Sequence, residues 1–141
     1  MHPFQVTPET KKMVMENIYF LLNQFIRCSA YENIIFCWVM HEQGIIDEII
    51  AKLETENCLV HNISLICDAG GLRKRLQKDI DAGIRSADVI QRSIARIGLY
   101  EKLDTKKIDV SHITSEQAAE RIIKGKNCGG KRYGSQIYSE H

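Results

Sequence analysis

Two short apolar runs constrain the fold of this chain more than any other feature of its sequence. Residues 34–40 are apolar without alternation and include β-branched and aromatic side chains, and residues 59–66 read as another strand. Runs of this kind are typical of strands that are covered on both faces, as in a parallel sheet. Between them, apolar residues recur at helical spacing at Ile45, Ile46, Ile49, Ile50 and Leu53. Strands that alternate with helices predict an α/β protein with a parallel sheet and right-handed crossovers.

Helices are predicted on both sides of these strands. The first begins after Thr7, which supplies a capping hydroxyl ahead of a proline and an acidic residue. Residues 69–81 and 87–102 read as two further helices, and a short strand around Ile108 follows them. The last helix begins at a capping box made by Thr114 and Gln117.

The composition changes abruptly at Gly125. The stretch from there to His141 is polar, rich in glycine and without periodicity, so we expect a flexible tail. We therefore expect one α/β domain over residues 1–124 and a tail over residues 125–141. Residues 125–131 match G-x-x-x-x-G-K, but arginine follows where Ser or Thr should bind magnesium. We interpret this match as coincidental.

The bulk composition narrows the possible functions. The chain has 141 residues and a formal net charge of +1, so we expect no wholesale nucleic-acid binding. Its longest apolar run is too short to span a bilayer, and the N-terminus has no apolar signal core. The five cysteines lack C-x-x-C spacing, and no His pair suggests zinc. We therefore expect a cytoplasmic protein with reduced thiols, no metal and no membrane partner.

Positive charge is concentrated directly after the second apolar run. The segment carries few acids, namely Asp79, Asp81 and Asp88, against the basic residues Arg73, Lys74, Arg75, Lys78, Arg85, Arg92 and Arg96. An arginine cluster beyond a buried strand is where an α/β protein would hold a phosphate-bearing ligand. The alternative is a solvated helix face with i, i+4 ion pairs such as Arg75–Asp79 or Asp88–Arg92.

Several segments together resemble a known family. The stretches NIIFCWVMHEQ, ISLICDAGGLRKRLQKDIDAGIR, DVIQRSIARI and KLDTKKIDVS, and the order of the elements, are similar to the P-loop nucleoside- and nucleotide-kinase-like phosphotransferases. That family includes AAA-type ATPases and shikimate and gluconate kinases. The resemblance covers about residues 1–124 and implies a three-layer fold, ATP and Mg²⁺ as cofactors, and phosphoryl transfer to a nucleoside-like or small hydroxyl acceptor.

The chain departs from that family at its beginning. No G-x-x-x-x-G-K-[ST] phosphate loop precedes residue 1, so the resemblance implies a member without its N-terminal strands. We therefore expect no kinase activity from this chain alone. In the family, the first strand lies between those that correspond to residues 34–40 and 59–66. Without it, we expect these two to pair directly, to leave a gap, or to form a strand-exchanged homodimer.

The resemblance also implies roles for individual residues. Arg85 and Arg92 would act as catalytic lid residues that clamp the transferred phosphate. Arg75 would lie against a purine base, and the loop with Ser111 and His112 would contact the nucleotide.

The loop after the first apolar run supplies the acceptor-side candidates. There Trp38, His41 and Gln43 would contact a nucleotide or nucleoside substrate. The plainer interpretations are that Trp38 is a core residue and that His41 and Gln43 belong to a polar loop that caps the next helix. For Asp68, the plainer interpretation is a helix cap. The other hypothesis for the whole chain is a non-catalytic module that binds a nucleotide or a protein.

Overall fold

A computed structural model describes residues 5–126 and 136–140. Along the chain the elements are α1 (Pro8–Arg27), β1 (Asn33–Cys37), α2 (Gln43–Lys52), β2 (Leu59–Ile66), α3 (Ala69–Asp81), α4 (Asp88–Glu101), β3 (Lys106–Asp109), α5 (Ser115–Lys126) and β4 (Gln136–Glu140). The strands form a sheet in which β1 pairs with β4, β4 with β2 and β2 with β3, each in parallel orientation. The prediction of an α/β protein with a parallel sheet is therefore confirmed.

The last strand in the sequence occupies an interior position in the sheet. The order is β1-β4-β2-β3, so β4 separates β1 from β2. Asn33 faces Gln136 on one side of β4, and Leu59 faces the same residue on the other. The expected direct pairing or gap between the two apolar strands is therefore wrong, because β4 lies between them and pairs with both.

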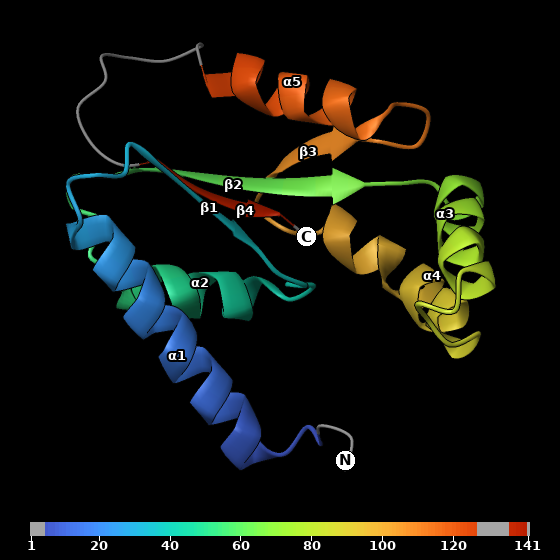
Figure 1. The fold of residues 1–141 in the computed structure, drawn as a ribbon, viewed down its shortest axis with the longest axis horizontal. Helices are drawn as coiled ribbons and strands as arrows, with labels where there is room; N and C mark the ends of the chain where they lie inside the picture. The colour runs from blue at the N-terminus through green and yellow to red at the C-terminus, as the bar shows by residue number, and fades with distance from the viewer. Residues whose placement is uncertain (1–4, 127–135, 141) are drawn as a thin grey trace.

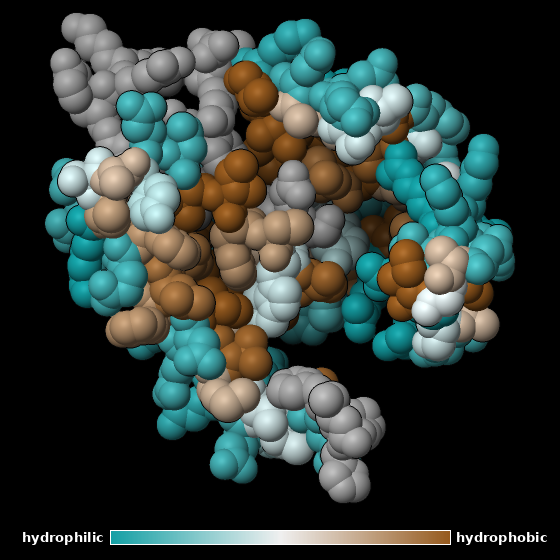
Figure 2. All heavy atoms as spheres, viewed as in Figure 1, coloured by the Kyte–Doolittle hydropathy of each residue, from teal (hydrophilic) through white to brown (hydrophobic). Residues whose placement is uncertain are grey.

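Helices cover both faces of the sheet (Figure 1). Helices α1 and α2 lie on one face, α5 lies on the other, and α3 and α4 lie beyond the carboxyl end of β2. Figure 2 shows apolar side chains gathered between α1 and α5, whereas the region of α3 is mostly hydrophilic.

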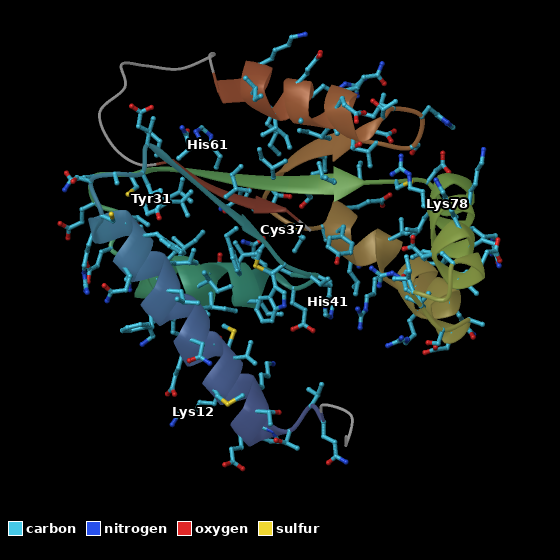
Figure 3. The ribbon with its side chains drawn as sticks, viewed as in Figure 1. Lys12, Tyr31, Cys37, His41, His61 and Lys78 are labelled. Atoms are coloured by element: carbon cyan, nitrogen blue, oxygen red, sulfur yellow. The ribbon has the colours of Figure 1, made fainter. Side chains whose placement is uncertain are left out.

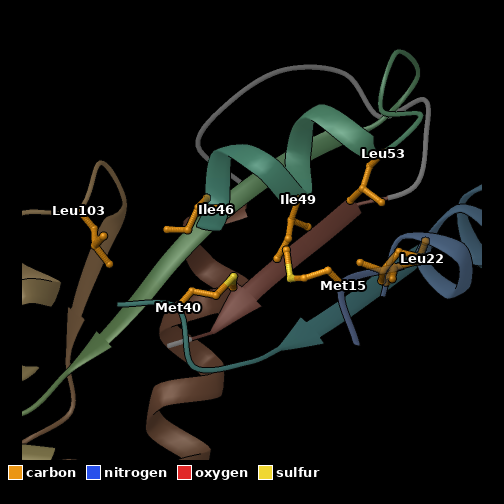
Figure 4. Close-up of a cluster of buried hydrophobic side chains, with 8 residues drawn as sticks. Met15, Leu22, Met40, Ile46, Ile49, Leu53 and Leu103 are labelled. Atoms are coloured by element: carbon orange, nitrogen blue, oxygen red, sulfur yellow. The ribbon is translucent and has the colours of Figure 1, made fainter. Parts of the chain in front are cut away.

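Each face has its own hydrophobic cluster. The larger cluster joins α1, α2, β1 with the loop that follows it, and the loop after α4. Its buried members are Met15, Leu22, Ile34, Met40, Ile46, Ile49, Leu53 and Leu103 (Figure 4). The smaller cluster packs α5 against β2 and β3 through Ile63, Ile108, Val110 and Ala118. Burial of these two apolar sets is the main stabilising contribution to the fold.

The first apolar run is only partly a strand. β1 ends at Cys37, whose partner Glu140 is the last residue of β4, so main-chain pairing with β4 stops there. Residues 38–40 lie in the loop that follows β1, where Met40 is 1% exposed and belongs to the larger cluster, and Trp38 packs against it. The predicted strand over residues 34–40 is therefore too long, since Met40 is buried by side-chain packing and not by sheet formation.

The predicted tail also differs from the structure. Residues 125 and 126 belong to α5, and Gln136–Glu140 form β4. A polar sequence can form an interior strand when main-chain pairing on both sides satisfies its N–H and C=O groups. The rest of the predicted tail and most of the G-x-x-x-x-G-K match lie outside the described residues.

The predicted helix starts are confirmed. The Thr7 side chain accepts a hydrogen bond from Thr10 N, and Thr114 and Gln117 form the expected reciprocal capping box. Asp68 caps α3 by accepting a hydrogen bond from Gly71 N at 2.6 Å. None of the described helices combines the length and apolarity that crossing a bilayer requires.

Candidate anion-binding cleft

A cleft of about 470 Å³ opens at the carboxyl end of β2, between the sheet and the helices α3 and α4. Three arginines line it: Arg85 from the turn between these helices, and Arg92 and Arg96 from α4. The other lining residues are Val39, Leu65, Ile66, Cys67, Leu72, Leu76, Val89, Ser93, Ile97 and Tyr100. The cleft therefore combines a largely apolar wall with a group of cations, and its size is within the range of small-molecule sites.

Two of the three arginines are paired with nearby aspartates. Arg85 Nε lies 3.0 Å from Asp79 Oδ2, and Arg92 Nε lies 2.9 Å from Asp88 Oδ2. Arg96 has no carboxylate within ion-pair distance among the described side chains of residues 5–125. Three guanidinium groups and two carboxylates leave one positive charge in excess. Anions are therefore attracted to the cleft.

Two ionisable side chains in or beside the cleft, Asp88 and Tyr100, have shifted pKa values. A hydrogen bond from the Ser86 side chain, and then the charge of Arg92, lower the pKa of Asp88. Burial raises the pKa of Tyr100, against which the charge of Arg96 acts in the opposite direction. The phenol therefore remains protonated near neutral pH and can donate a hydrogen bond, while the guanidinium groups supply positive charge.

A second polar cluster joins the carboxyl ends of β2 and β3. The Asp68 N–H donates to Ser111 Oγ at 2.8 Å, and this hydroxyl donates to Asp109 Oδ1 at 2.6 Å. Hydrogen bonds from Gly71 and Ser111, and the charge of His112, lower the pKa of Asp68. Ser111 also lowers the pKa of Asp109. These bonds fix the loop after β3 against the start of α3.

Arg75 belongs to this second cluster. Its Nη2 donates to the carbonyl oxygens of Val110 and Ile113, the latter at 3.3 Å. The predicted nucleotide-binding residues Arg75, Ser111 and His112 therefore lie together, apart from the residues that line the cleft. In this arrangement Arg75 uses its guanidinium to hold the loop after β3.

The predicted acceptor-side residues do not line the cleft. Trp38 packs against the larger hydrophobic cluster. Gln43 donates to Asp47 and accepts from Asp104 N at 2.8 Å, which ties the start of α2 to the loop before β3. His41 lies in the turn after β1 (Figure 3), and its Nε2 lies 3.4 Å from Glu42 Oε1. Its Nδ1 is buried and has no hydrogen-bond partner among the residues that the structure describes.

Arg96 and Tyr100 line the cleft but were not predicted as part of a site. Arg96 was counted only as one of the basic residues, yet it follows Arg92 by four positions and must share its helix face. Tyr100 continues the same spacing. The helical period was therefore the signal that could have identified both. Val39, not its neighbour Trp38, lines the opposite wall.

The described residues contain no group of three or more His, Cys, Asp or Glu side chains that could hold a metal ion. The fold and the cleft together define an α/β protein with a parallel sheet and a cationic, largely apolar cleft at the carboxyl end of β2. No family model, curated protein or solved structure matches this chain.

Proposed function

We propose that the cleft binds a small molecule that carries a phosphate group on an apolar or aromatic body, such as a nucleotide. The observation that supports this proposal is that Arg85, Arg92 and Arg96 line one cleft beyond the end of a buried strand. Planar guanidinium donors suit the several oxygens of a phosphate. The apolar lining and Tyr100 suit the rest of such a ligand.

The reaction that fits this ligand is phosphoryl transfer, and we propose that the chain is a P-loop kinase-like phosphotransferase remnant. Its complete form would use ATP and Mg²⁺ and pass the γ-phosphoryl group to a nucleoside-like or small hydroxyl acceptor. In that role Arg85 and Arg92 would stabilise charge on the transferred group. Support comes from the sequence resemblance and from the position of Arg85 and Arg92 in the cleft beyond the carboxyl end of β2.

The chain alone is expected to bind without turnover, since a phosphate loop is absent from its sequence. Binding of a panel of nucleoside mono- and diphosphates can be followed through Trp38, the single tryptophan, which adjoins the cleft residue Val39. Arg96→Ala should weaken binding at least tenfold, whereas Arg73→Ala, on the exposed side of α3, should have little effect. Equal affinities for the two variants would contradict the proposed site.

Turnover is tested separately. ATP, Mg²⁺ and the same acceptors are incubated with the chain, and phosphorylated product is measured. Magnesium-dependent transfer would refute the expectation of an inactive remnant. Binding without transfer would instead favour the second hypothesis, a non-catalytic nucleotide-binding module.

A further inference from the structure

The sheet depends on β4 for its continuity. β4 is the only strand that pairs with β1 among the described residues. β2 divides its pairing between two neighbours: residues 59–62 face β4, and residues 63–66 face β3. Without β4, β1 and the first half of β2 would have no sheet partner, so the space between them is a strand slot that must be filled.

The segment that fills this slot is joined to the rest of the fold by nine residues, 127–135. The end of α5 lies over β2 and β3, because Gly125 shares a small pocket with His61 and Lys106. β4 begins level with Leu59, four residues before Ile63, the partner of Lys106. The end of α5 and the start of β4 are thus offset by four residues along the strands, at about 3.3 Å each, by one strand spacing of about 5 Å and by a helix layer of about 10 Å. Together these offsets give a gap of roughly 20 Å between the two ends.

Nine residues can span up to about 33 Å, which exceeds this gap. The same segment would make the same main-chain pairs if it came from another molecule, because the slot is defined by β1 and β2 alone. An exchanged form therefore keeps every sheet contact and differs from the closed form only in the path of the connection.

We propose that the slot between β1 and β2 is a strand-acceptor site that takes residues 136–140 from a second copy of this chain. A parallel five-residue strand with the register of β4 is the ligand, and main-chain hydrogen bonds supply most of the recognition. The tethered strand competes with the second copy at an effective concentration in the millimolar range. Exchange of β4 between two copies therefore becomes dominant when the connection between α5 and β4 is too short for β4 to reach the slot of its own chain.

The first experiment supplies the strand as a separate peptide. In the full chain, Tyr138→Pro removes a main-chain donor in the middle of β4, where an interior strand excludes proline. A fluorescent peptide with the sequence of residues 133–141 should then bind at least tenfold more tightly to this variant than to the wild type or to Tyr138→Phe. The same peptide with proline at position 138 should not bind.

Each outcome of this experiment decides whether the slot between β1 and β2 accepts a separate strand. A folded Tyr138→Pro chain that ignores the peptide overturns the proposal. If the variant does not fold, recovery of its helical circular dichroism on adding the peptide supports the acceptor site, and failure to recover overturns it.

The second experiment tests the second copy. Deletion of residues 128–133 leaves three connecting residues with a reach of about 13 Å, which is shorter than the gap of roughly 20 Å. Light scattering should then show a dimer, and adding Tyr138→Pro to the deletion should abolish it. Insertion of four residues after Gly130 should give a monomer. A deletion variant that stays a folded monomer, or that dimerises despite the proline, overturns exchange between copies.

Discussion

The Nε atom of Arg92 lies 2.9 Å from Oδ2 of Asp88, one turn earlier on α4. Both side chains are more than half exposed, so the pair contributes little to stability. Its effect on the cleft is larger, because Asp88 partly cancels the charge that Arg92 would present to an anion. The acid therefore lowers the affinity of the cleft while it holds the guanidinium in place.

Asp88→Asn should raise the affinity of the cleft for a nucleoside monophosphate by about two- to fivefold, the range of an exposed charge interaction. Titration of the variant and of the wild type at equal salt concentration measures this change. Asp81→Asn is the matched control, because Asp81 accepts a hydrogen bond from Gln77 on α3 and forms no ion pair with an arginine of the cleft among the described residues. A loss of affinity in Asp88→Asn would show instead that the carboxylate is needed to orient Arg92.

Substitution by alanine at two helical glycines should change the free energy of unfolding in opposite directions. A Cβ on Gly71 would lie 2.9 Å from Cys67 Sγ and 3.2 Å from the Ser111 carbonyl oxygen, whereas a Cβ on Gly98 would meet nothing within 4 Å. Gly71→Ala should lower the free energy of unfolding by about 1–3 kcal/mol through overpacking. Gly98→Ala should raise it by about 0.5–1 kcal/mol through helix propensity. Urea unfolding measures both, and a stabilised Gly71→Ala would contradict this close contact.

Most of the fold could be predicted from local sequence patterns. The bounds of β2 and α3 match the predicted ranges because each element has a strong period and a clear start. β1 was predicted too long, since apolar composition alone does not distinguish a strand from a buried loop such as that containing Met40. β4 could not be predicted, because its pairing with β1 joins opposite ends of the chain and leaves no local pattern.

The candidate site was predictable to a similar degree. Arg85 and Arg92 were predicted together, and both line the cleft. The ion pair of Arg85 with Asp79 crosses the turn between α3 and α4, so helical spacing could not reveal it. The position of Arg75 likewise depends on carbonyl groups of the loop after β3, which sequence spacing does not place.

The polar cluster at the ends of β2 and β3 should make stability depend on pH. Asp68 and Asp109 both have pKa values below the ordinary 3.8, mainly through hydrogen bonds from Gly71 and Ser111 respectively. A carboxyl group with a lowered folded pKa stabilises the protein above its unfolded pKa, and this contribution is lost as the pH falls through the folded pKa. The free energy of unfolding should therefore decrease as the pH is lowered from about 5 to about 2.

Ser111→Ala tests the origin of this pH dependence. The variant lacks the hydroxyl that donates to Asp109, so its free energy of unfolding should vary less steeply with pH below about 4. Ser93→Ala, which removes a hydroxyl from α4 instead, should keep the wild-type slope. Urea unfolding at a series of pH values gives both slopes. Identical slopes for the two variants would mean that Ser111 does not set the pKa of Asp109.

A buried hydroxyl pair links β2 to the loop before β3. Ser64 is fully buried, and its Oγ lies 2.6 Å from Thr105 Oγ1, which is partly exposed. Removing one hydroxyl or the other should therefore lower the free energy of unfolding by unequal amounts. Ser64→Ala leaves a hydroxyl that water can reach and should cost about 0.5–1.5 kcal/mol, whereas Thr105→Val leaves a buried hydroxyl without its partner and should cost about 1–3 kcal/mol.

The double variant separates the pair interaction from the burial of each group. With both hydroxyls removed, no unpaired donor remains inside, so the combined loss should be smaller than the sum of the two single losses. Urea unfolding of the four proteins completes the double-mutant cycle. Strictly additive losses would show that the two hydroxyls do not interact, and a larger loss in Ser64→Ala than in Thr105→Val would contradict the unequal burial on which the prediction depends.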